Sequence, residues 1–376
     1  MDLNWNEDQR IIIETARKFF EKETPAALVR ELMKDEKGYS PEIWKKMSEL
    51  GWPAFAFDEA YGGLGGSFLD LAVLFEEMGR AAVPTPFFST VVLSGFLLQG
   101  CGSADIKKTY LPKIAEGECI STLAFLGKSG IYSRSAIGLE AESVAEGYRL
   151  NGTAFFVPYA HVADQILCAA KMTSADSDSI TLFLVDAKSA GLEVIPLKTI
   201  SGDGIECLVN LKGVTVTPSR MVGEMGKGWS YIQELWPKIS AILSCECIGG
   251  MNKVIEMTIN HVNERVQFGQ PLSAFQIVQH MCVDMSIKAE TSRNAAYYAV
   301  WLISEGLECE KEAAVAKAWC GEAYKDVTKI AHQVTGAIGF TEEYDLHLYT
   351  RQAKKLELLF GNEAFHRNIV ADKLKL

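Results

Sequence analysis

Two segments of the sequence decide the fold: Gln333-Val334-Thr335-Gly336-Ala337-Ile338-Gly339-Phe340-Thr341, and Arg265-Val266-Gln267-Phe268-Gly269-Gln270-Pro271 upstream of it. Between them apolar residues recur at three-to-four spacing, as at Ile277, Met281 and Met285, which indicates long helices. The glycines of the first segment break that pattern. Taken alone, they could serve only the packing of a helix break.

Both segments resemble motifs of the acyl-CoA dehydrogenase flavoproteins, and the resemblance covers nearly the whole chain. In that family Arg-x-x-Phe-Gly and Gln-x-x-Gly-Gly-x-Gly lie near the two ends of helices in a C-terminal bundle. The resemblance implies that they hold the pyrophosphate and adenine side of FAD, largely across a subunit boundary. The one small departure is Ala337, where the family usually has a second glycine.

A guanidinium can form two parallel hydrogen bonds to pyrophosphate oxygens, which suits Arg265 to this role. The turn at Phe268-Gly269 would bring the backbone close to the cofactor. The resemblance therefore assigns FAD contacts to residues of the two segments and to Gln276, which follows the upstream one: Arg265, Gln267, Phe268, Gln276, Gln333, Gly336 and Ala337.

Composition excludes several classes of protein. The net charge is −11, the pI is near 5.2 and no basic stripe is visible, which argues against binding of nucleic acid. No apolar run approaches the roughly 20 residues that span a bilayer. The nine cysteines show no CxxC spacing and no metal pattern, and their scatter fits a reducing compartment. We therefore expect a cytoplasmic protein without a metal site.

The pattern along the chain predicts an α+β protein of three domains. Residues 1–118 show helical periodicity, residues 119–228 show short alternating or apolar runs, and residues 229–376 are helical again. We expect an α-helical domain, a β-barrel domain and a four-helix bundle, which is the architecture that the resemblance implies. The glycine-rich run 62–66 lacks the strand and lysine of a phosphate loop, so we interpret it as a loop between helices.

The run Asn151-Gly152-Thr153-Ala154-Phe155-Phe156-Val157 resembles the family strand whose tip lies against the flavin ring. Phe156 would stack on the ring, and Val157 would offer its backbone N–H. Two departures accompany this strand. Pro158 replaces a threonine that bonds flavin, and it has neither a hydroxyl nor an N–H. Residues 125–132 replace the family segment Thr-Glu-Pro-x-x-Gly-Ser-Asp.

Oxidation of an acyl thioester to its α,β-enoyl form needs a base for the α-proton, a hydride acceptor and hydrogen bonds to the thioester carbonyl. In the family the base is commonly a glutamate before a glycine that lies ten residues after an arginine. Arg351 and Gly361 keep that spacing, so the base position falls on Phe360. The alternative family position, counted back from Arg265 through Gly249, falls on Ile239. Both positions are apolar.

Two other carboxylates remain as candidates. Glu246 lies seven residues after Ile239 in an apolar helical sequence, so it is expected to be buried, with either a partner or a catalytic role. Glu363, two residues beyond Gly361, is the second candidate base. Glu246 could equally be a packing residue that pairs with an arginine or a backbone group.

These observations predict FAD-dependent dehydrogenation of an acyl-CoA thioester, with electrons passed to an electron-transferring flavoprotein. Residues 340–349 and 359–367 resemble the branch of the family that acts on steroid side-chain and other bulky or cyclic acyl groups. Several of that branch are heterotetramers, so we expect a homotetramer or a heterotetramer with a related subunit. A half-site subunit without its own base, and altered flavin chemistry such as enoyl-CoA reduction or elimination, stay open as alternatives.

Overall fold

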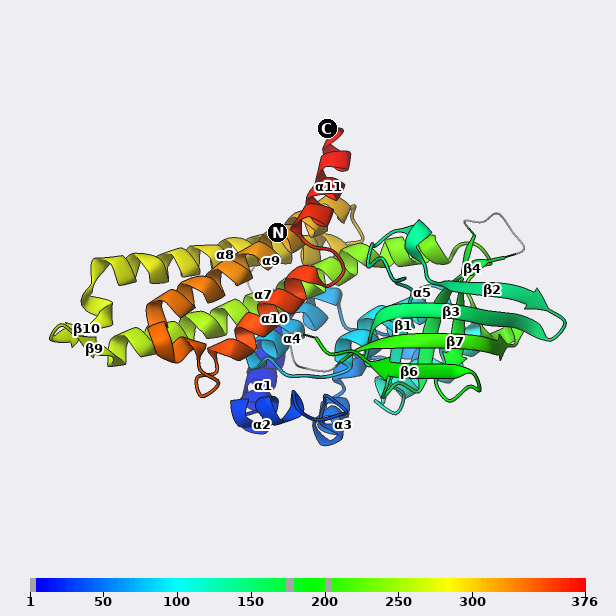
Figure 1. Cartoon of the computed structure of the whole chain (residues 1–376), viewed down its shortest axis with the longest axis horizontal. Helices are drawn as coiled ribbons and strands as arrows, with labels where there is room; N and C mark the ends of the chain where they lie inside the picture. Colours follow the sequence, from blue (N-terminus) through cyan, green and yellow to red (C-terminus); the bar gives the residue numbers. More distant parts are fainter. Residues whose placement is uncertain (1–4, 174–178, 200–204) are drawn as a thin grey trace. The chain divides into compact units, whose positions relative to one another are not determined.

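The computed structural model describes residues 5–173, 179–199 and 205–376. Internal contacts divide the chain into two compact units (Figure 1). The helical unit comprises Met1–Glu31, Ser67–Val83 and Pro237–Leu376, and the sheet unit comprises Leu32–Gly66 and Pro84–Trp236. The division falls inside a single long helix, α7, between Trp236 and Pro237.

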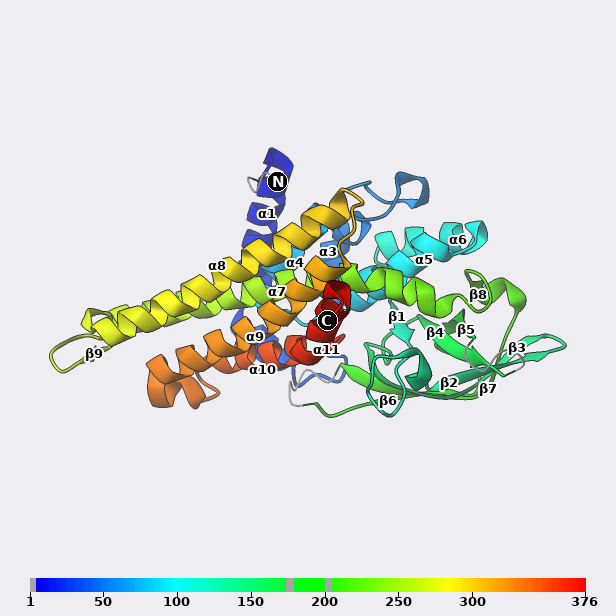
Figure 2. The same cartoon turned by 90° about the horizontal axis from the view of Figure 1, so that it is seen from above.

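The helical unit is a bundle around α9, against which α8, α10 and α11 pack, while α1 packs on α4 and α4 on α8 (Figure 2). An Asn6–Gln9 capping box begins α1, and a Ser67–Asp70 box begins α4. The helices are α1 (Glu7–Glu23), α2 (Ala26–Leu32), α4 (Phe68–Ala81), α7 (Gly228–Glu264), α8 (Gln276–Ser304), α9 (Glu310–Thr335), α10 (Leu346–Leu358) and α11 (Glu363–Leu374). The two short strands β9 (Val266–Gln267) and β10 (Gln270–Pro271) form a hairpin between α7 and α8.

Glycines let α4 and α7 approach closely. A Cβ on Gly249 would lie 1.8 Å from the carbonyl oxygen of Glu76, and one on Gly79 would lie 2.0 Å from that of Glu246. Beside this crossing the Glu76 carboxylate accepts hydrogen bonds from the Tyr297 hydroxyl at 2.5 Å and the Arg293 guanidinium at 2.6 Å. The buried acid is therefore paired, as burial of a charge requires.

The sheet unit combines short helices with one sheet. Its helices are α3 (Pro41–Glu49), α5 (Phe96–Cys101) and α6 (Ala104–Ala115), and a π-helical stretch (Phe88–Gly95) leads into α5. The glycine-rich run 62–66 is a loop before α4, as expected. A Cβ on Gly63 would lie 1.9 Å from the carbonyl oxygen of Phe57, so the glycine there serves close packing.

The sheet is open, which corrects the expectation of a barrel. Its order is β6-β7-β3-β2-β4-β5-β8, with β1 parallel to β4, and no pairing among the described residues joins β6 to β8. The strands are β1 (Ser121–Ala124), β2 (Leu139–Val144), β3 (Gly147–Pro158), β4 (Gln165–Met172), β5 (Ile180–Asp186), β6 (Leu192–Pro196), β7 (Glu206–Val216) and β8 (Met221–Val222). The α+β fold with an N-terminal helical part, a central sheet and a C-terminal helical bundle is otherwise confirmed.

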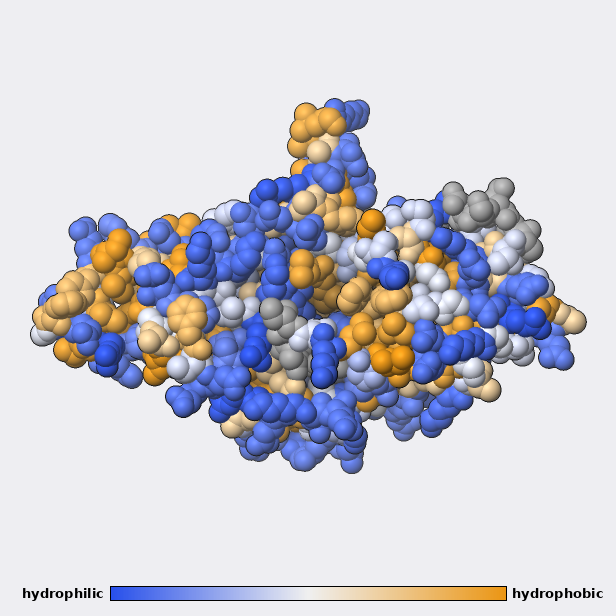
Figure 3. Space-filling model, viewed as in Figure 1, coloured by the Kyte–Doolittle hydropathy of each residue, from blue (hydrophilic) through white to orange (hydrophobic). Residues whose placement is uncertain are grey.

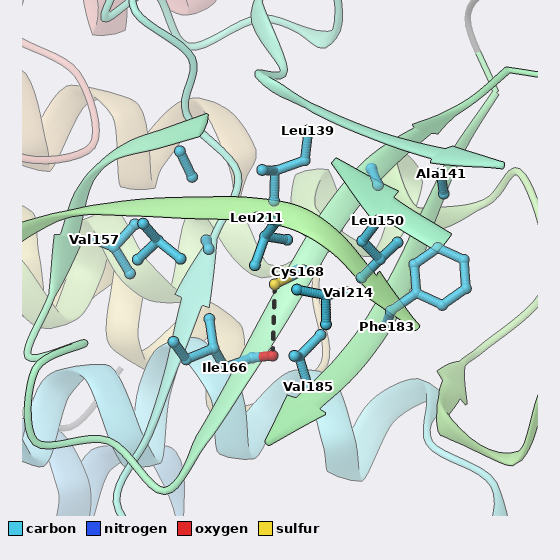
Figure 4. Close-up of a cluster of buried hydrophobic side chains, with 14 of the residues drawn as sticks. Leu139, Ala141, Leu150, Val157, Ile166, Cys168, Phe183, Val185, Leu211 and Val214 are labelled. Atoms are coloured by element: carbon cyan, nitrogen blue, oxygen red, sulfur yellow. Dashed lines mark hydrogen bonds between the residues drawn. The ribbon is translucent and has the colours of Figure 1, made fainter. Parts of the chain in front are cut away.

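Apolar side chains from the central strands fill the core of the sheet unit, among them Leu139, Leu150, Ile166, Phe183 and Leu211 (Figure 4). All nine cysteines are free thiols. Burial raises the thiol pKa of Cys101, Cys119, Cys168 and Cys320 to about 12 and that of Cys207 to about 11, and it raises those of Cys245 and Cys247 as well. None of the described helices is long and apolar enough to cross a membrane.

Candidate active site

The hairpin between α7 and α8 lies at one end of the helical unit (Figures 1 and 2). Phe268 and Gly269 form its tip with φ values of 54° and 81°, and the Phe268 side chain is 92% exposed. Figure 3 shows apolar surface at this end, where Val266, Ile277 and Val283 are also exposed. A group of exposed apolar side chains beside polar ones is typical of surfaces that bind a ligand or another subunit.

The polar groups of the hairpin are available to a ligand. The side chains of Arg265, Gln267 and Gln276 are exposed and accept or donate no hydrogen bond within the described part of the chain. Gln276 begins the 29-residue helix α8, and Phe275 before it provides no side-chain cap. The N–H groups of Val278 and Gln279 bond the Phe275 carbonyl oxygen, whereas those of Gln276 and Ile277 have no side-chain cap. A guanidinium next to an uncapped helix N-terminus is a donor set for phosphate oxygens.

The turn after α9 lies at the same end of the helical unit (Figures 1 and 2). Gly336 has φ 67° and ψ −143°, a conformation that only glycine adopts readily, and it begins a 3₁₀ helix (Gly336–Phe340). Gln333 and Ala337 are exposed, and Ala337 does not disturb the turn. The Phe340 ring is 74% exposed and stacks on His332 at a centroid distance of 4.6 Å.

Strand β3 of the sheet unit carries a bulge at the predicted flavin-contacting residues. The register with β7 shifts between Ala154 and Val157, and Phe156 has φ 55°, a strained value for an aromatic residue. The bulge leaves the Phe156 side chain 47% exposed, whereas Val157 is buried and paired with Cys207. Bulges of this kind reorient a side chain next to a functional site.

Models of known families match both ends of the chain. Residues 6–118 match the acyl-CoA dehydrogenase N-terminal domain, and residues 226–375 match the acyl-CoA dehydrogenase C-terminal domain. The chain belongs to the acyl-CoA dehydrogenase family. Members of this family are flavin oxidoreductases, and FAD is their cofactor.

Three relatives illustrate the range of the acyl-CoA dehydrogenase family around this chain. Butyryl-CoA dehydrogenase of Megasphaera elsdenii has a solved structure with a TM-score of 0.93 and 25% identity, covering 100% of both chains. The solved ChsE4–ChsE5 complex of Mycobacterium tuberculosis gives a TM-score of 0.90 at 26% identity, covering 100% of this chain and 99% of that chain. The subunit CarC of the caffeyl-CoA reductase-Etf complex of Acetobacterium woodii is 27% identical, covering 98% and 99% of the two chains.

The segment that departs from the acyl-CoA dehydrogenase motif, residues 125–132, contributes to an aromatic cluster in the sheet unit. The Trp236 ring lies 5.4 Å from Tyr132, 6.3 Å from Phe125 and 6.5 Å from Trp229, measured between centroids. The sequence analysis missed the two tryptophans of this cluster. The two tryptophans are seven residues apart on one helix, a spacing that predicts side chains on the same face.

Both usual base positions of the acyl-CoA dehydrogenase family are apolar and buried in this chain. Phe360 is 3% exposed and has φ 57°, and Ile239 is fully buried in α7. Gly361 follows with φ 105°, and a Cβ there would lie 2.3 Å from the ring of Phe365. The turn between α10 and α11 is therefore tightly packed, and it carries the aromatic ring of Phe360 at the position where the family usually has the carboxylate of the base.

Glu246 is half-buried in α7 and lies in a chain of hydrogen bonds. The Gln352 side-chain N–H donates to Glu246 Oε1 at 3.3 Å, and the Tyr324 hydroxyl donates to Gln352 Oε1 at 2.8 Å. Burial raises the pKa of Tyr324 well above its usual value, so its hydroxyl stays a donor. Seven residues rise about 10 Å along a helix, so Glu246 lies further along α7 than Ile239.

Glu363 is the first residue of α11, where the helix dipole favours a carboxylate. Its side chain is partly exposed, and its Oε1 lies 3.9 Å from Nη1 of Arg367. This ion pair is long and near the surface.

The sequence analysis did not identify a buried cation beside the α10–α11 turn. Lys317 of α9 is 2% exposed, and burial lowers its pKa to about 8. His366 of α11 is fully buried, and burial together with Lys317 lowers its pKa to about 3. The sequence could have indicated a buried lysine, because Lys317 follows an alanine-rich apolar run on the inner face of a helix.

Proposed function

We propose that this protein is a subunit of an FAD-dependent dehydrogenase that oxidises an acyl-CoA thioester to the α,β-enoyl form and passes the electrons to an electron-transferring flavoprotein. The observation that carries the proposal is the exposed donor set of the hairpin, Arg265 with Gln267, next to the uncapped start of α8. These groups have no partner in the described chain and fit a pyrophosphate. Bound FAD would supply the hydride acceptor for the β-carbon.

The chain's own residues then hold and orient the cofactor. Arg265 neutralises the pyrophosphate charge, and Gln333 with the Gly336 turn accommodates the adenine and ribose end of an FAD bound by a neighbouring subunit. Phe156, exposed by the β3 bulge, stacks on the flavin ring. In this proposal Val157 contributes only its backbone, because its side chain is buried.

For the α-proton we propose Glu246 as the base and Glu363 as the second candidate. Glu246 lies inside α7 between the buried residues Cys245 and Cys247, whereas Glu363 lies at the start of α11. The Oε1 of Glu246 is held by Gln352, which fixes the orientation of the carboxylate. Because Glu246 lies about 10 Å along α7 from Ile239, an acyl group that it serves must extend further along that helix.

The second candidate function is that of a half-site subunit in a heteromeric dehydrogenase. Phe360 and Ile239 favour it, because neither can accept a proton. The likeness to the ChsE4–ChsE5 complex supports it.

A third candidate, reduction or elimination on an enoyl-CoA, has support in the likeness to the caffeyl-CoA reductase-Etf subunit. In each case we propose a tetramer, either homomeric or with a related subunit, in the cytoplasm.

Cofactor binding tests the proposal directly. Arg265→Ala removes the charge-assisted bonds to pyrophosphate, and flavin affinity should fall roughly 10- to 100-fold in folded protein. Arg149→Ala is the matched control, since Arg149 is an exposed arginine on β3. Flavin absorbance per subunit after gel filtration measures the result. Full flavin retention by Arg265→Ala would count against the assignment.

Anaerobic titrations separate the three candidates. A homomeric dehydrogenase bleaches its flavin with an acyl-CoA, and a reductase reoxidises reduced flavin with an enoyl-CoA. A half-site subunit does neither until it is coexpressed with a related subunit. The panel should include cyclic and steroid side-chain thioesters, since residues 340–349 resemble the branch that uses them.

A further inference from the structure

The ammonium group of Lys317 is enclosed by backbone carbonyl groups at the end of α10. Its Nζ lies 2.8 Å from the carbonyl oxygen of Leu356, 3.3 Å from that of Glu357 and 3.1 Å from that of Gly361. The first two belong to the last turn of α10, whose carbonyls have no partner within the helix. A lysine has three N–H donors only while it is charged, so the charged form matches the three acceptors.

A second buried side chain holds the other side of the same turn. His366 Nε2 lies 3.1 Å from the carbonyl oxygen of Phe360, and because a carbonyl only accepts, Nε2 carries the proton. Lys317 and His366 together hold the carbonyls of 356, 357, 360 and 361. Phe360, between the carbonyls held by Lys317 and the carbonyl held by His366, has φ 57°. A residue with a Cβ adopts this left-handed conformation only where its surroundings impose it.

We propose that Lys317 is a positioning residue: its ammonium fixes the backbone of the turn 359–361 and thereby fixes where the Phe360 ring stands toward the acyl-CoA. The second half of this statement rests on the proposed function, because Phe360 stands at the position where the family usually carries the base for the α-proton of the acyl group. The first half, the fixing of the turn, does not depend on it.

The titratable groups that act on the charge of Lys317 lie on α7, α9, α10 and α11. They are Cys247 of α7, Cys320 of its own helix α9, Glu357 of α10 and His366 of α11. Burial raises the pKa of both thiols, the pKa of Glu357 is lowered, and that of His366 is about 3. Of these groups, therefore, Lys317 is the one that changes charge near pH 8.

Deprotonation of Lys317 removes one of its three N–H donors and leaves one carbonyl of the turn without its bond. The position of Phe360 should then loosen as the pH rises through about 8. Glu357 does not compensate, since its carboxylate is bound by Lys325 at 3.1 Å and Lys354 at 2.7 Å on the outer side.

Lys317→Met and Lys325→Met form a matched pair of variants. Both remove an amine from α9 beside Glu357, but Lys325 is half-exposed and bonds only the Glu357 side chain, not the turn carbonyls. The flavin-loaded protein, coexpressed with its partner subunit if one is needed, is titrated with an acyl-CoA from pH 6.5 to 9.5, and the flavin absorbance change gives the apparent Kd.

Wild type and Lys325→Met should bind tightly at pH 7 and lose affinity through about pH 8. Lys317→Met should bind the acyl-CoA roughly 10-fold more weakly at every pH, without that transition and with unchanged flavin content. A tenfold loss corresponds to about 1.4 kcal/mol of lost contact between the displaced Phe360 ring and the acyl group. The same transition in Lys317→Met as in wild type overturns the proposal.

Two further measurements cover the cases in which that titration gives no signal. If Lys317→Met does not fold, His366→Gln keeps a donor for the Phe360 carbonyl and His366→Leu does not, so only the leucine variant should weaken binding. Equal binding by the two variants overturns the role of the turn. If no acyl-CoA or enoyl-CoA perturbs the flavin of the wild type, the proposed function fails. Hydrogen exchange then tests the turn itself.

In that exchange experiment the amides of Leu359 and Gly361, which bond Lys355 and Leu358, should lose protection at least about tenfold in Lys317→Met but not in Lys325→Met. Unchanged protection in Lys317→Met means that the ammonium does not fix the turn, whatever the protein's activity.

Discussion

Single residues mark how this chain departs from its relatives. The family position of the base carries Phe360, and the nearest half-buried carboxylate on α7, Glu246, is bonded to Gln352. The sequence predicted a buried acid at Glu246 and the side chain is half-buried, but the hydrogen-bond chain from Tyr324 through Gln352 could not be predicted. It depends on which helices meet, and three different helices supply its members.

Glu246→Gln tests the base. The variant keeps the volume and much of the hydrogen bonding but cannot take a proton, so bound flavin should remain while its reduction by acyl-CoA slows roughly 10²- to 10⁴-fold. Stopped-flow absorbance measures the rate, with Glu363→Gln prepared beside it. Reduction of Glu246→Gln at the wild-type rate means that Glu246 is structural. If both variants keep that rate, a partner subunit supplies the base.

His366 predicts a loss of stability in acid. The pKa of His366 is lowered from 6.5 to about 3 in the folded protein. Between pH 6.5 and 3, the imidazole is therefore protonated in the unfolded chain but not in the folded protein. The free energy of unfolding is therefore not reduced by His366 above pH 6.5, and it decreases as the pH falls from 6.5 toward 3. Urea midpoints at pH 7 and 4.5 should differ less for His366→Gln than for wild type. The exposed His280→Gln should behave like wild type.

At the scale of elements, the helices could be predicted and the special turns could not. Leu71, Leu74, Phe75 and Met78 recur at helical spacing, and all four are buried in α4. The alternating runs form strands, as predicted. Closure of a sheet depends on pairings between distant strands, which these runs do not specify, and the sheet is open where a barrel was expected. The bulge at Phe156 depends on the register with β7, which the strand's own residues do not specify.

The crossing of α4 and α7 predicts the effect of a single methyl group. Gly249→Ala places a Cβ 1.8 Å from the carbonyl oxygen of Glu76, so the helices must separate, and the free energy of unfolding should fall by about 1–3 kcal/mol. Gly100→Ala at the end of α5 is the control, because nothing lies within 4 Å of its added Cβ. Urea denaturation measures both. A Gly249→Ala protein as stable as Gly100→Ala would contradict the close approach.

At the scale of the whole molecule, the exposed end of the helical unit is where we propose that FAD and a neighbouring subunit bind. Phe268, Ile277 and Phe340 expose apolar surface beside the polar groups proposed to hold FAD. The family resemblance predicted FAD contacts here from sequence, because the two motifs are short and local. The partner could not be predicted, since an interface with an identical chain and one with a related chain use the same kind of surface.

If FAD binds between subunits, flavin and assembly must stabilise each other by mass action. Flavin-loaded protein should therefore sediment as an oligomer on dilution to concentrations at which flavin-free protein has dissociated. Sedimentation velocity with detection at the flavin absorbance checks this for wild type and for Arg265→Ala. A monomer saturated with flavin would contradict a site shared between subunits.

The alkylation rates of the buried thiols report how often each unit opens. Alkylating reagents attack the thiolate, and burial keeps Cys168 and Cys207 of the sheet unit, like Cys245, Cys247 and Cys320 of the helical unit, as unreactive thiols. Labelling of these residues then proceeds only as fast as the surrounding core opens. Mass spectrometry of the labelled peptides would show whether the sheet and the bundle open in one event or in two, without any probe added to the protein.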